Sequence, residues 1–533
     1  MRRRNFLRLG LLTGTIAGTW RKAMAAMSGH ESAFDVSEKS VVVLQEAMRS
    51  GMITARQLVQ VYLARIQALD KDGPCLNAII EINPDVEAIA EALDAERKAK
   101  GPRGPLHGIP VLLKDNIATH DRMQTTAGSL ALVGAQPPRD AHLVSRLREA
   151  GAVILGKTNL SEWANLRSLR STSGWSARGG LTLNPYALDR NTSGSSSGSG
   201  TAIAASLAAV AIGTETDGSI TSPASMMSLV GFKPTVGLVS RAGIIPLAHS
   251  QDTAGPMTRC VADAAALLTA IAGSDTRDRA TAEASGKMLD YSKYLDRNGL
   301  KGRRIGVVRG QFVGPNDLVA AVVETQLDTL KAQGATLIDV PEVPNSSKYK
   351  ETELTVLLYE FKTDLAAYLA EYAPGASVRN LADVIAFNEK HREREMLYFG
   401  QEYLVDAQAK GGLDSREYLD ALSNNLKYSR AEGIDKVLVE HRLDALVAPT
   451  GGLAWLTDFI KGDAESGSFT SQAAVSGYPH LTVPAGFVHG LPCGISFVGG
   501  AWSEAELIAM AYAYEQASMN RRPPSFSKSV NLR

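Results

Sequence analysis

Residues 190–225 read RNTSGSSSGSGT, AIAASLAAVAIG and TETDGSITSPAS in three consecutive blocks. Every position from Ser193 to Gly200 is Ser or Gly, which by itself is typical of a flexible linker. The next block is rich in alanine and apolar residues, and a second Ser/Gly turn follows it. Both of these are typical of a packed interior. The Ser/Gly segment therefore does not fit a tether between domains.

A glycine-rich turn that leads into a helix of small residues exposes several backbone N–H groups, which suit an anion or a developing oxyanion. The run has no GxxxxGK[ST] pattern, and it has serine where a nucleotide-binding loop would place its lysine. The strand and the downstream acidic residue of a dinucleotide fingerprint are not in place either. The excess of serine favours hydroxyl chemistry instead.

The composition argues against nucleic-acid binding and against a metal site. The chain has 533 residues, 44% hydrophobic and 21% charged, with 48 glycines, and it can bury a large core. Lys+Arg and Asp+Glu both number 56, so the formal net charge is zero and the chain has no excess positive charge to attract nucleic acid. Cys75, Cys260 and Cys493 lie far apart, and the nine histidines show no ligand spacing. We expect no metal and no cofactor.

The first residues, MRRRNFLRLGLLTGTIAGTW, resemble a twin-arginine export signal. Arg3 and Arg4 precede Asn-Phe-Leu, a short apolar stretch follows, and AMA at Ala23–Ala25 offers a cleavage site. The apolar stretch is far shorter than the roughly 20 residues that a membrane span requires. We expect residues 1–25 to be a signal peptide read by the twin-arginine export machinery, and the protein to be periplasmic or secreted.

Alternating patterns beyond the signal predict α/β architecture. GIPVLLKD and GAVILGKT are typical of strands buried on both faces, with AHLVSRLREAG as a crossover helix between them. RRIGVVRG, DLVAAVVETQLDTLKAQG and ATLIDV form another strand–helix–strand unit. LDALVAPT, LTVPAG and GISFVGG add late strands before a closing helix, SEAELIAMAYAYEQAS. We expect one large domain over residues 35–533, with a helix-rich insertion or cap at about 275–441.

Hydroxyl chemistry needs a base, because a serine hydroxyl is a weak nucleophile at its free pKa. The GxSxG match at Gly194–Gly198 overlaps the Ser/Gly run and has no histidine obviously paired with it. Lys114 ends the apolar strand IPVLLK, where burial would lower its pKa towards the neutral form. The alternative is that Lys114 pairs with Asp115 or caps the strand. From these residues alone, the alternative is favoured.

Longer motifs carry a family resemblance. GPLHGIPVLLKDN, GAVILGKTNLSEW, SGSSSGSGTAIAASLAAVAIGTETDGSITSPASMMSLVGFKPTVGLVS and SQDTAGPMTR resemble the amidase signature family in order and spacing. GYPHLTVPAG and the segment from GLPCGISFVGG onward are similar to its C-terminal sheet and helix. The resemblance covers nearly all of the chain after the signal, and SEWANLRS, SGWSARGG and GTETDGSI are most similar to the peptide amidases of that family. It implies a single α/β domain with a mixed, mostly buried central sheet flanked by helices.

The resemblance also implies roles for individual residues. Ser219 resembles the acylated nucleophile, Ser195 the bridging serine after a cis peptide from Gly194, and Lys114 the base that works in its neutral form. Lys114 would take a proton from Ser195, and Ser195 would take one from Ser219 as Ser219 attacks an amide carbonyl. The oxyanion would be held by backbone N–H groups that belong to Thr216, Asp217, Gly218 and Ser219.

Two departures from the family pattern bear on the substrate. Asp217 stands where many members have glycine, which fits the peptide amidases, and Thr221 stands where many have arginine, which disfavours an acidic substrate. Ser196 and Ser197 are candidates for orienting the loop. We expect His107 and Asp115, which flank the lysine strand, to have structural roles.

Three functions compete. The favoured one is an amidase that acts on peptide amides or other small amides and releases ammonia or an amine. The second is an amidotransferase subunit that generates ammonia for transfer RNA amidation, which an export signal contradicts. The third is a non-catalytic periplasmic binding protein that keeps the fold, although binding alone needs none of Lys114, Ser195 and Ser219.

Overall fold

The computed structural model describes residues 34–284, 286–313 and 317–531. The expected signal peptide, residues 1–25, lies outside these residues. Among the described helices, none is long and apolar enough to cross a membrane.

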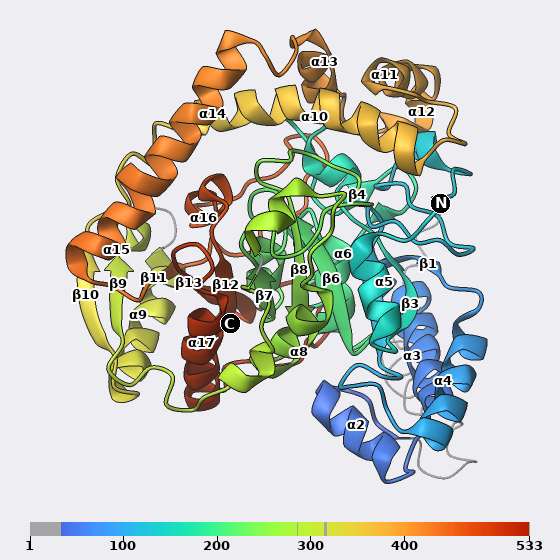
Figure 1. Cartoon of the computed structure of the whole chain (residues 1–533), viewed down its shortest axis with the longest axis horizontal. Helices are drawn as coiled ribbons and strands as arrows, with labels where there is room; N and C mark the ends of the chain where they lie inside the picture. The colour runs from blue at the N-terminus through green and yellow to red at the C-terminus, as the bar shows by residue number, and fades with distance from the viewer. Residues whose placement is uncertain (1–33, 285, 314–316, 532–533) are drawn as a thin grey trace, which may run out of the picture.

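A mixed sheet runs through the molecule (Figure 1). Within the described residues it has 11 strands in the order β1-β3-β2-β6-β8-β7-β12-β13-β11-β9-β10. Strand β2 is parallel to β3 and β6, and β9 is parallel to β10 and β11, whereas the strands between these two groups pair antiparallel. The strands are β1 Ile79–Ile82, β2 Pro110–Lys114, β3 Val153–Thr158, β6 Val210–Glu215, β7 Val230–Lys233, β8 Thr253–Thr258, β9 Arg304–Val308, β10 Thr336–Val340, β11 Ala445–Pro449, β12 His480–Val488 and β13 Leu491–Val498, with β4 Trp175–Ser176 and β5 Gly180–Leu181 as a separate pair.

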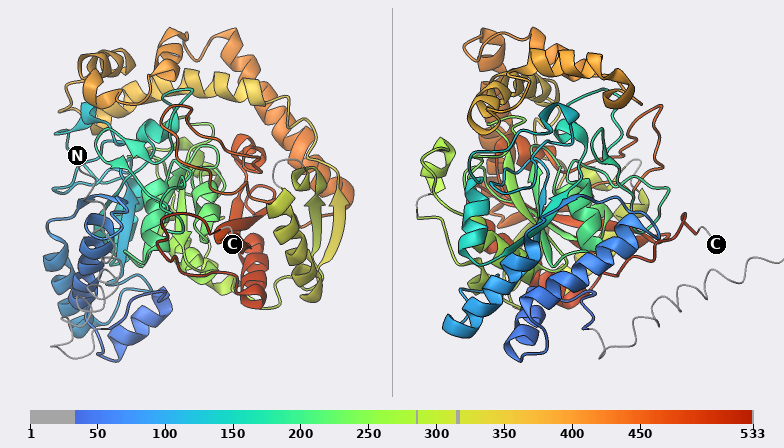
Figure 2. Two further views of the ribbon diagram at one scale, coloured as in Figure 1. Left: turned by 180° about the vertical axis from the view of Figure 1, so that it is seen from behind. Right: turned by 90° about the vertical axis from the view of Figure 1, so that its right-hand side faces the viewer.

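Helices cover both faces of this sheet (Figure 2). On one face α8 packs on β7 and β8, α17 and α9 pack on β12 and β13, and α5 and α17 contact α8. On the other face α6 packs on β2, β3 and β6, and α7 packs on β7, β12 and β13. The helices are α2 Val41–Arg49, α3 Ala55–Arg65, α4 Val86–Lys100, α5 His142–Glu149, α6 Ser197–Ala204, α7 Thr221–Met226, α8 Val261–Ile271, α9 Asp317–Ala332, α10 Lys350–Tyr372, α11 Leu381–Lys390, α12 Arg392–Glu395, α13 Glu402–Ala409, α14 Arg416–Ser429, α15 Asp435–His441, α16 Ser471–Ser476 and α17 Glu504–Ser518.

This architecture confirms the expected α/β domain with a mixed, buried sheet between helices. Strands β2, β3, β6 and β11 are buried along their whole length, because helices or neighbouring strands surround them. A break near Gly51, which has a φ of 76°, separates α2 from α3. Helix α3 begins with a capping box, in which Thr54 and Gln57 satisfy each other's free backbone N–H groups.

The segment from about residue 275 to 441 contains two kinds of structure. Strand β9, helix α9 and strand β10 extend the central sheet at one edge. Helices α10 to α14 follow and arch around the outside of the sheet and its inner helices (Figure 1). The boundaries of an insertion or cap within this range stay a prediction.

A buried cluster of charged side chains links helix α12, one of the arching helices, to the rest of the domain. Arg167 pairs with Glu162 and, at 3.6 Å, with Glu395 of α12, and all three side chains are fully buried. Glu395 also accepts a hydrogen bond from the backbone N–H of Leu130 at 2.8 Å. Removing the cation would leave two carboxylates in the interior, so the three residues depend on one another.

Candidate active site

Lys114 is the last residue of β2, and the register with β6 decides what its side chain meets. Leu113 lies opposite Ile212 in this parallel pair, so the end of β2 lies beside the residues that follow Ile212. The Lys114 Nζ donates to the Thr214 hydroxyl at 2.9 Å, to the Thr214 carbonyl at 3.2 Å and to the Ser195 Oγ at 2.7 Å. The lysine is thus in direct contact with a serine hydroxyl of the Ser/Gly run.

The surroundings of Lys114 favour its neutral form. The side chain is fully buried, and this burial lowers the pKa of Lys114 to about 7, although the charges of Asp252 and Glu215 act to raise it. A pKa near the working pH is what a general base requires, because a useful fraction of the amine is then unprotonated.

Burial alone does not distinguish this lysine. Lys157 and Lys233 are equally buried, and the pKa of each is lowered to about 8 by burial. Lys157 donates to the Ile117 carbonyl and the Thr125 hydroxyl, and Lys233 donates to backbone carbonyls. Of these three lysines, Lys114 is the one that contacts the Ser/Gly run.

The Ser/Gly run is a fixed loop in the core. The Gly194–Ser195 peptide bond is cis, as the family resemblance implies. A Cβ atom on Gly194 would lie 2.3 Å from the Ser161 Oγ, so only glycine fits there. The Ser196 Oγ donates to the Thr214 carbonyl at 3.0 Å, and the Ser196 N–H donates to the Ser219 carbonyl at 3.1 Å. The run therefore lies directly against the second Ser/Gly turn.

That second turn, Thr216–Ser219, is held by the carboxylate of Glu215. The backbone N–H groups of Ile220 and Thr221 donate to its Oε2 at 2.8 and 2.9 Å. Within the described chain, the N–H groups of Asp217, Gly218 and Ser219 have no acceptor, so they are free to bind an oxyanion. Gly218 has a φ of 74°, a conformation that favours glycine. Ser219 is 7% exposed, whereas Lys114 and Ser195 are fully buried.

A loop before β8 supports the same turn from the other side. The Thr216 hydroxyl donates to Asp252 at 2.5 Å, and Asp252 also accepts from the N–H groups of Leu247 and Ala248 at 2.8 and 2.9 Å. Burial raises the pKa of Asp252 to about 6, against these hydrogen bonds. Gln251 donates to the Thr216 carbonyl at 3.3 Å.

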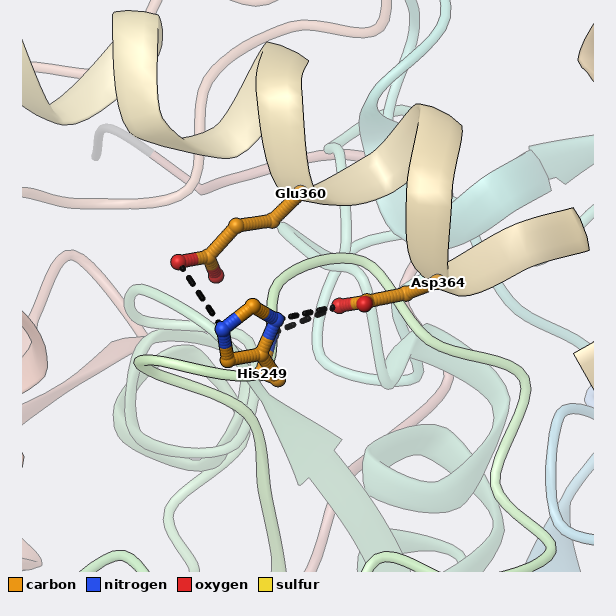
Figure 3. A group of neighbouring side chains, drawn as sticks. All are labelled: His249, Glu360 and Asp364. Atoms are coloured by element: carbon orange, nitrogen blue, oxygen red, sulfur yellow. Dashed lines mark hydrogen bonds and ion pairs between the residues drawn. The ribbon is translucent and has the colours of Figure 1, made fainter. Parts of the chain in front are cut away.

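Helix α10 in turn holds this loop through His249 (Figure 3). Asp364 accepts from the His249 Nδ1 at 2.8 Å, and Glu360 lies 3.4 Å from the Nε2. The two carboxylates face opposite ring nitrogens, which is the arrangement of an imidazolium between two anions and not of three ligands around one metal ion. The hydrogen bond and charge of Asp364 and the charge of Glu360 raise the pKa of His249, against the effect of burial.

The remaining residues that the sequence singled out have structural partners. His107 bonds the Leu93 carbonyl at 2.9 Å, far from the serines. Asp115 pairs with Arg178 at 3.3 Å, so the alternative in which Lys114 pairs with Asp115 is wrong. The Ser197 Oγ donates to the Ser193 carbonyl at 2.6 Å and orders the run internally.

The sequence did not point to three residues that complete the site, namely Thr214, Gln251 and Asp252. Thr214 lies within the quoted motif, and the parallel pairing of the two buried strands could have placed it beside Lys114. Gln251 and Asp252 reach the turn through a loop whose path the sequence pattern does not predict.

The chain is similar to known proteins along most of its length. The sequence model of the family described as Amidase matches residues 57–508. The crystal structure of native peptide amidase from Stenotrophomonas maltophilia is 53% identical with a TM-score of 0.88, covering 92% of this chain and 99% of that one. A probable amidase of Arabidopsis thaliana is 44% identical, covering 93% of each chain. A glutamyl-tRNA(Gln) amidotransferase subunit of Halorhodospira halophila is 34% identical, covering 90% of this chain and 97% of that protein.

Proposed function

We propose a substrate and a mechanism for this chain, which belongs to the amidase family and is an amide-hydrolysing enzyme. Its substrates are peptides with a C-terminal carboxamide, or other small amides, and its products are the free acid and ammonia or an amine. The similarity to a peptide amidase at 53% identity supports this class more than the 34% identity to the amidotransferase subunit supports transfer RNA amidation.

The observation that carries the mechanism is the 2.7 Å hydrogen bond between the Lys114 Nζ and the Ser195 Oγ in a fully buried setting. Neutral Lys114 takes the proton of Ser195, and Ser195 takes the proton of Ser219. The Ser219 Oγ then forms a bond to the amide carbonyl carbon. The resulting oxyanion accepts hydrogen bonds from the free N–H groups of the Thr216–Ser219 turn, each worth about 2.7–4 kcal/mol in comparable enzymes.

The same relay runs in reverse to break the amide bond. An amide anion is a very poor leaving group, so Lys114 returns its proton through Ser195 to the nitrogen as the C–N bond breaks. Ammonia or an amine departs and leaves an ester on Ser219. Water then attacks this ester with the relay as base, which releases the acid and restores the Ser219 hydroxyl.

Ammonia release from a panel of amides tests the proposal. The panel contains peptides with a C-terminal amide, the same peptides as free acids, and simple aliphatic amides, with Ser219→Ala as the control. We expect ammonia from the amidated peptides and none from the free acids, whose only amides are peptide bonds. No ammonia from the amidated peptides, or full activity of Ser219→Ala, would contradict the proposal.

We also propose that the enzyme is exported in folded form by the twin-arginine machinery to the periplasm or beyond. The support is the order Arg3-Arg4-Asn5-Phe6-Leu7 at the start of the chain. Replacing both arginines with lysine should move amidase activity from the periplasmic to the cytoplasmic fraction. An unchanged distribution would show that export does not use this signal.

A further inference from the structure

Two carboxyl groups from distant parts of the chain face each other beside the candidate nucleophile. Asp217 lies two positions before Ser219, and Glu353 lies in the first turn of α10. Burial raises the pKa of Glu353 well above its usual range, and the charge and hydrogen bond of Asp217 raise it further. The two groups are therefore close enough to share a proton.

Polar atoms without partners surround this pair. The Asp217 Oδ2 accepts from the Ser471 hydroxyl at 2.5 Å, whereas its buried Oδ1 accepts from no N–H or hydroxyl group of the described residues. Gln251 is 1% exposed and donates to the Glu353 Oε1 at 2.9 Å, which leaves its own buried Oε1 without a donor. The hydroxyl of Tyr349, also 1% exposed, has no partner, and the charges of Asp217 and Glu353 act to raise its pKa. Buried polar atoms left without partners call for a ligand.

The missing partner is a donor of hydrogen bonds with a positive charge. The Asp217 Oδ1 and the Gln251 Oε1 can only accept hydrogen bonds, and no N–H or hydroxyl group of the described residues donates to either. Among the residues that the structure describes, no lysine or arginine forms an ion pair with Asp217 or Glu353. An ammonium group offers three N–H donors and a single charge, which matches both deficits.

We infer that Asp217, Gln251 and Glu353 form a subsite for an ammonium group carried by the amide substrate. This inference rests on the proposed function, because it adds a substrate preference to the same site. The ammonium has two possible sources, the free α-amino group of an amino acid amide or short peptide amide, and a basic side chain. Asp217 is the residue that supplies the charge, and Gln251 and Glu353 supply further acceptors.

Matched substrate pairs test the subsite. Leucinamide and its isosteric 2-hydroxy analogue differ only in the α-ammonium, and N-acetyl-lysinamide and N-acetyl-norleucinamide differ in a side-chain ammonium. The measured quantity is the ratio of kcat/KM within each pair, for the wild type, for Asp217→Asn and for Glu351→Gln. Glu351 is exposed on the same helical turn as Glu353, so its variant controls for charge loss outside the subsite.

We expect the ratio to fall about tenfold in Asp217→Asn, since a hydrogen-bonded charge pair is lost, and to stay unchanged in Glu351→Gln. The pair whose ratio falls identifies the source of the ammonium. A second measurement needs no variant: ethylammonium chloride should inhibit hydrolysis of the neutral hydroxy amide competitively, whereas KCl at equal ionic strength should not.

The inference is overturned if Asp217→Asn lowers both members of each pair equally, or if ethylammonium and potassium act alike. Failure of the proposed function gives a different result, because the wild type would then release no ammonia even from the neutral amides.

Discussion

Replacing Asp252 with Asn should move the acidic limb of the pH–rate profile to lower pH. In the wild type only the neutral form of Lys114 works, so kcat/KM should rise about tenfold per pH unit below 7 and level off above it. Burial is the main cause of the lowered pKa of Lys114, and the charge of Asp252 is the first of two that oppose it. Removing that charge lets the pKa of Lys114 fall further.

The expected shift is roughly one pH unit, which corresponds to about 1.4 kcal/mol. At pH 6 about a tenth of Lys114 is neutral in the wild type, and roughly half would be neutral in the variant. Relative to its own plateau, activity at pH 6 should therefore rise about fivefold in Asp252→Asn.

The assay is kcat/KM for ammonia release from one neutral amide between pH 5 and pH 9, with each profile scaled to its plateau. Asp328→Asn, which removes an exposed carboxylate of α9, is the matched control and should leave the limb in place. Thermal melting checks that both variants are folded.

Two results would exclude this effect of Asp252 on Lys114. Loss of the limb in Asp252→Asn would assign it to Asp252, whose own pKa is raised to about 6, and not to Lys114. A limb that stays in place or moves to higher pH would show that the charge of Asp252 does not act on the base.

Further predictions concern the base and the stability of the fold. Lys114→Arg keeps a cation but cannot deprotonate, so kcat/KM should fall about 10³-fold or more, and retention of a tenth of the activity would exclude Lys114 as the base. Arg167→Met leaves the buried carboxylates of Glu162 and Glu395 without their cation and should lower the free energy of unfolding by about 3–5 kcal/mol, whereas a loss below about 1 kcal/mol would mean that the pair is not coupled. Because its raised pKa favours the imidazolium in the folded state, His249 should stabilise the protein below about pH 6.5, and this contribution should vanish as the pH rises through the raised pKa. In His249→Gln the loss of melting temperature should therefore be larger at pH 6 than at pH 8.5, and small throughout because the side chain is partly exposed; a pH-independent loss would contradict it.

Local sequence patterns were sufficient to predict most of the strands and helices of the fold. The buried runs that became β2, β3 and β11 are continuous apolar segments bounded by polar residues, and the break at Gly51 is a local signal. The residues alone did not identify Lys114, because Lys157 and Lys233 also end up buried in strands. What distinguishes them is the register between strands, which no local pattern contains, and only the family resemblance pointed to Lys114.

Sequence patterns could not predict the supporting residues of the site either, because these residues meet only through long-range contacts. Asp252 and Gln251 meet Thr216 through a loop, and Glu353 arrives on a helix about a hundred positions later. Contacts of this kind depend on how the arch of helices lies over the sheet. Neither apolar periodicity nor a motif of consecutive residues carries that information.

Covalent labelling identifies the serine that attacks the substrate. The Ser219 Oγ should form a bond to the phosphorus of a fluorophosphonate as fluoride leaves, which adds one mass increment to the whole protein. Peptide mapping should place that increment on Ser219. Ser219→Ala should remove the label, and Lys114→Arg should slow its formation, because the serine needs the relay to lose its proton. Labelling at Ser195, or labelling that persists in Ser219→Ala, would contradict the account.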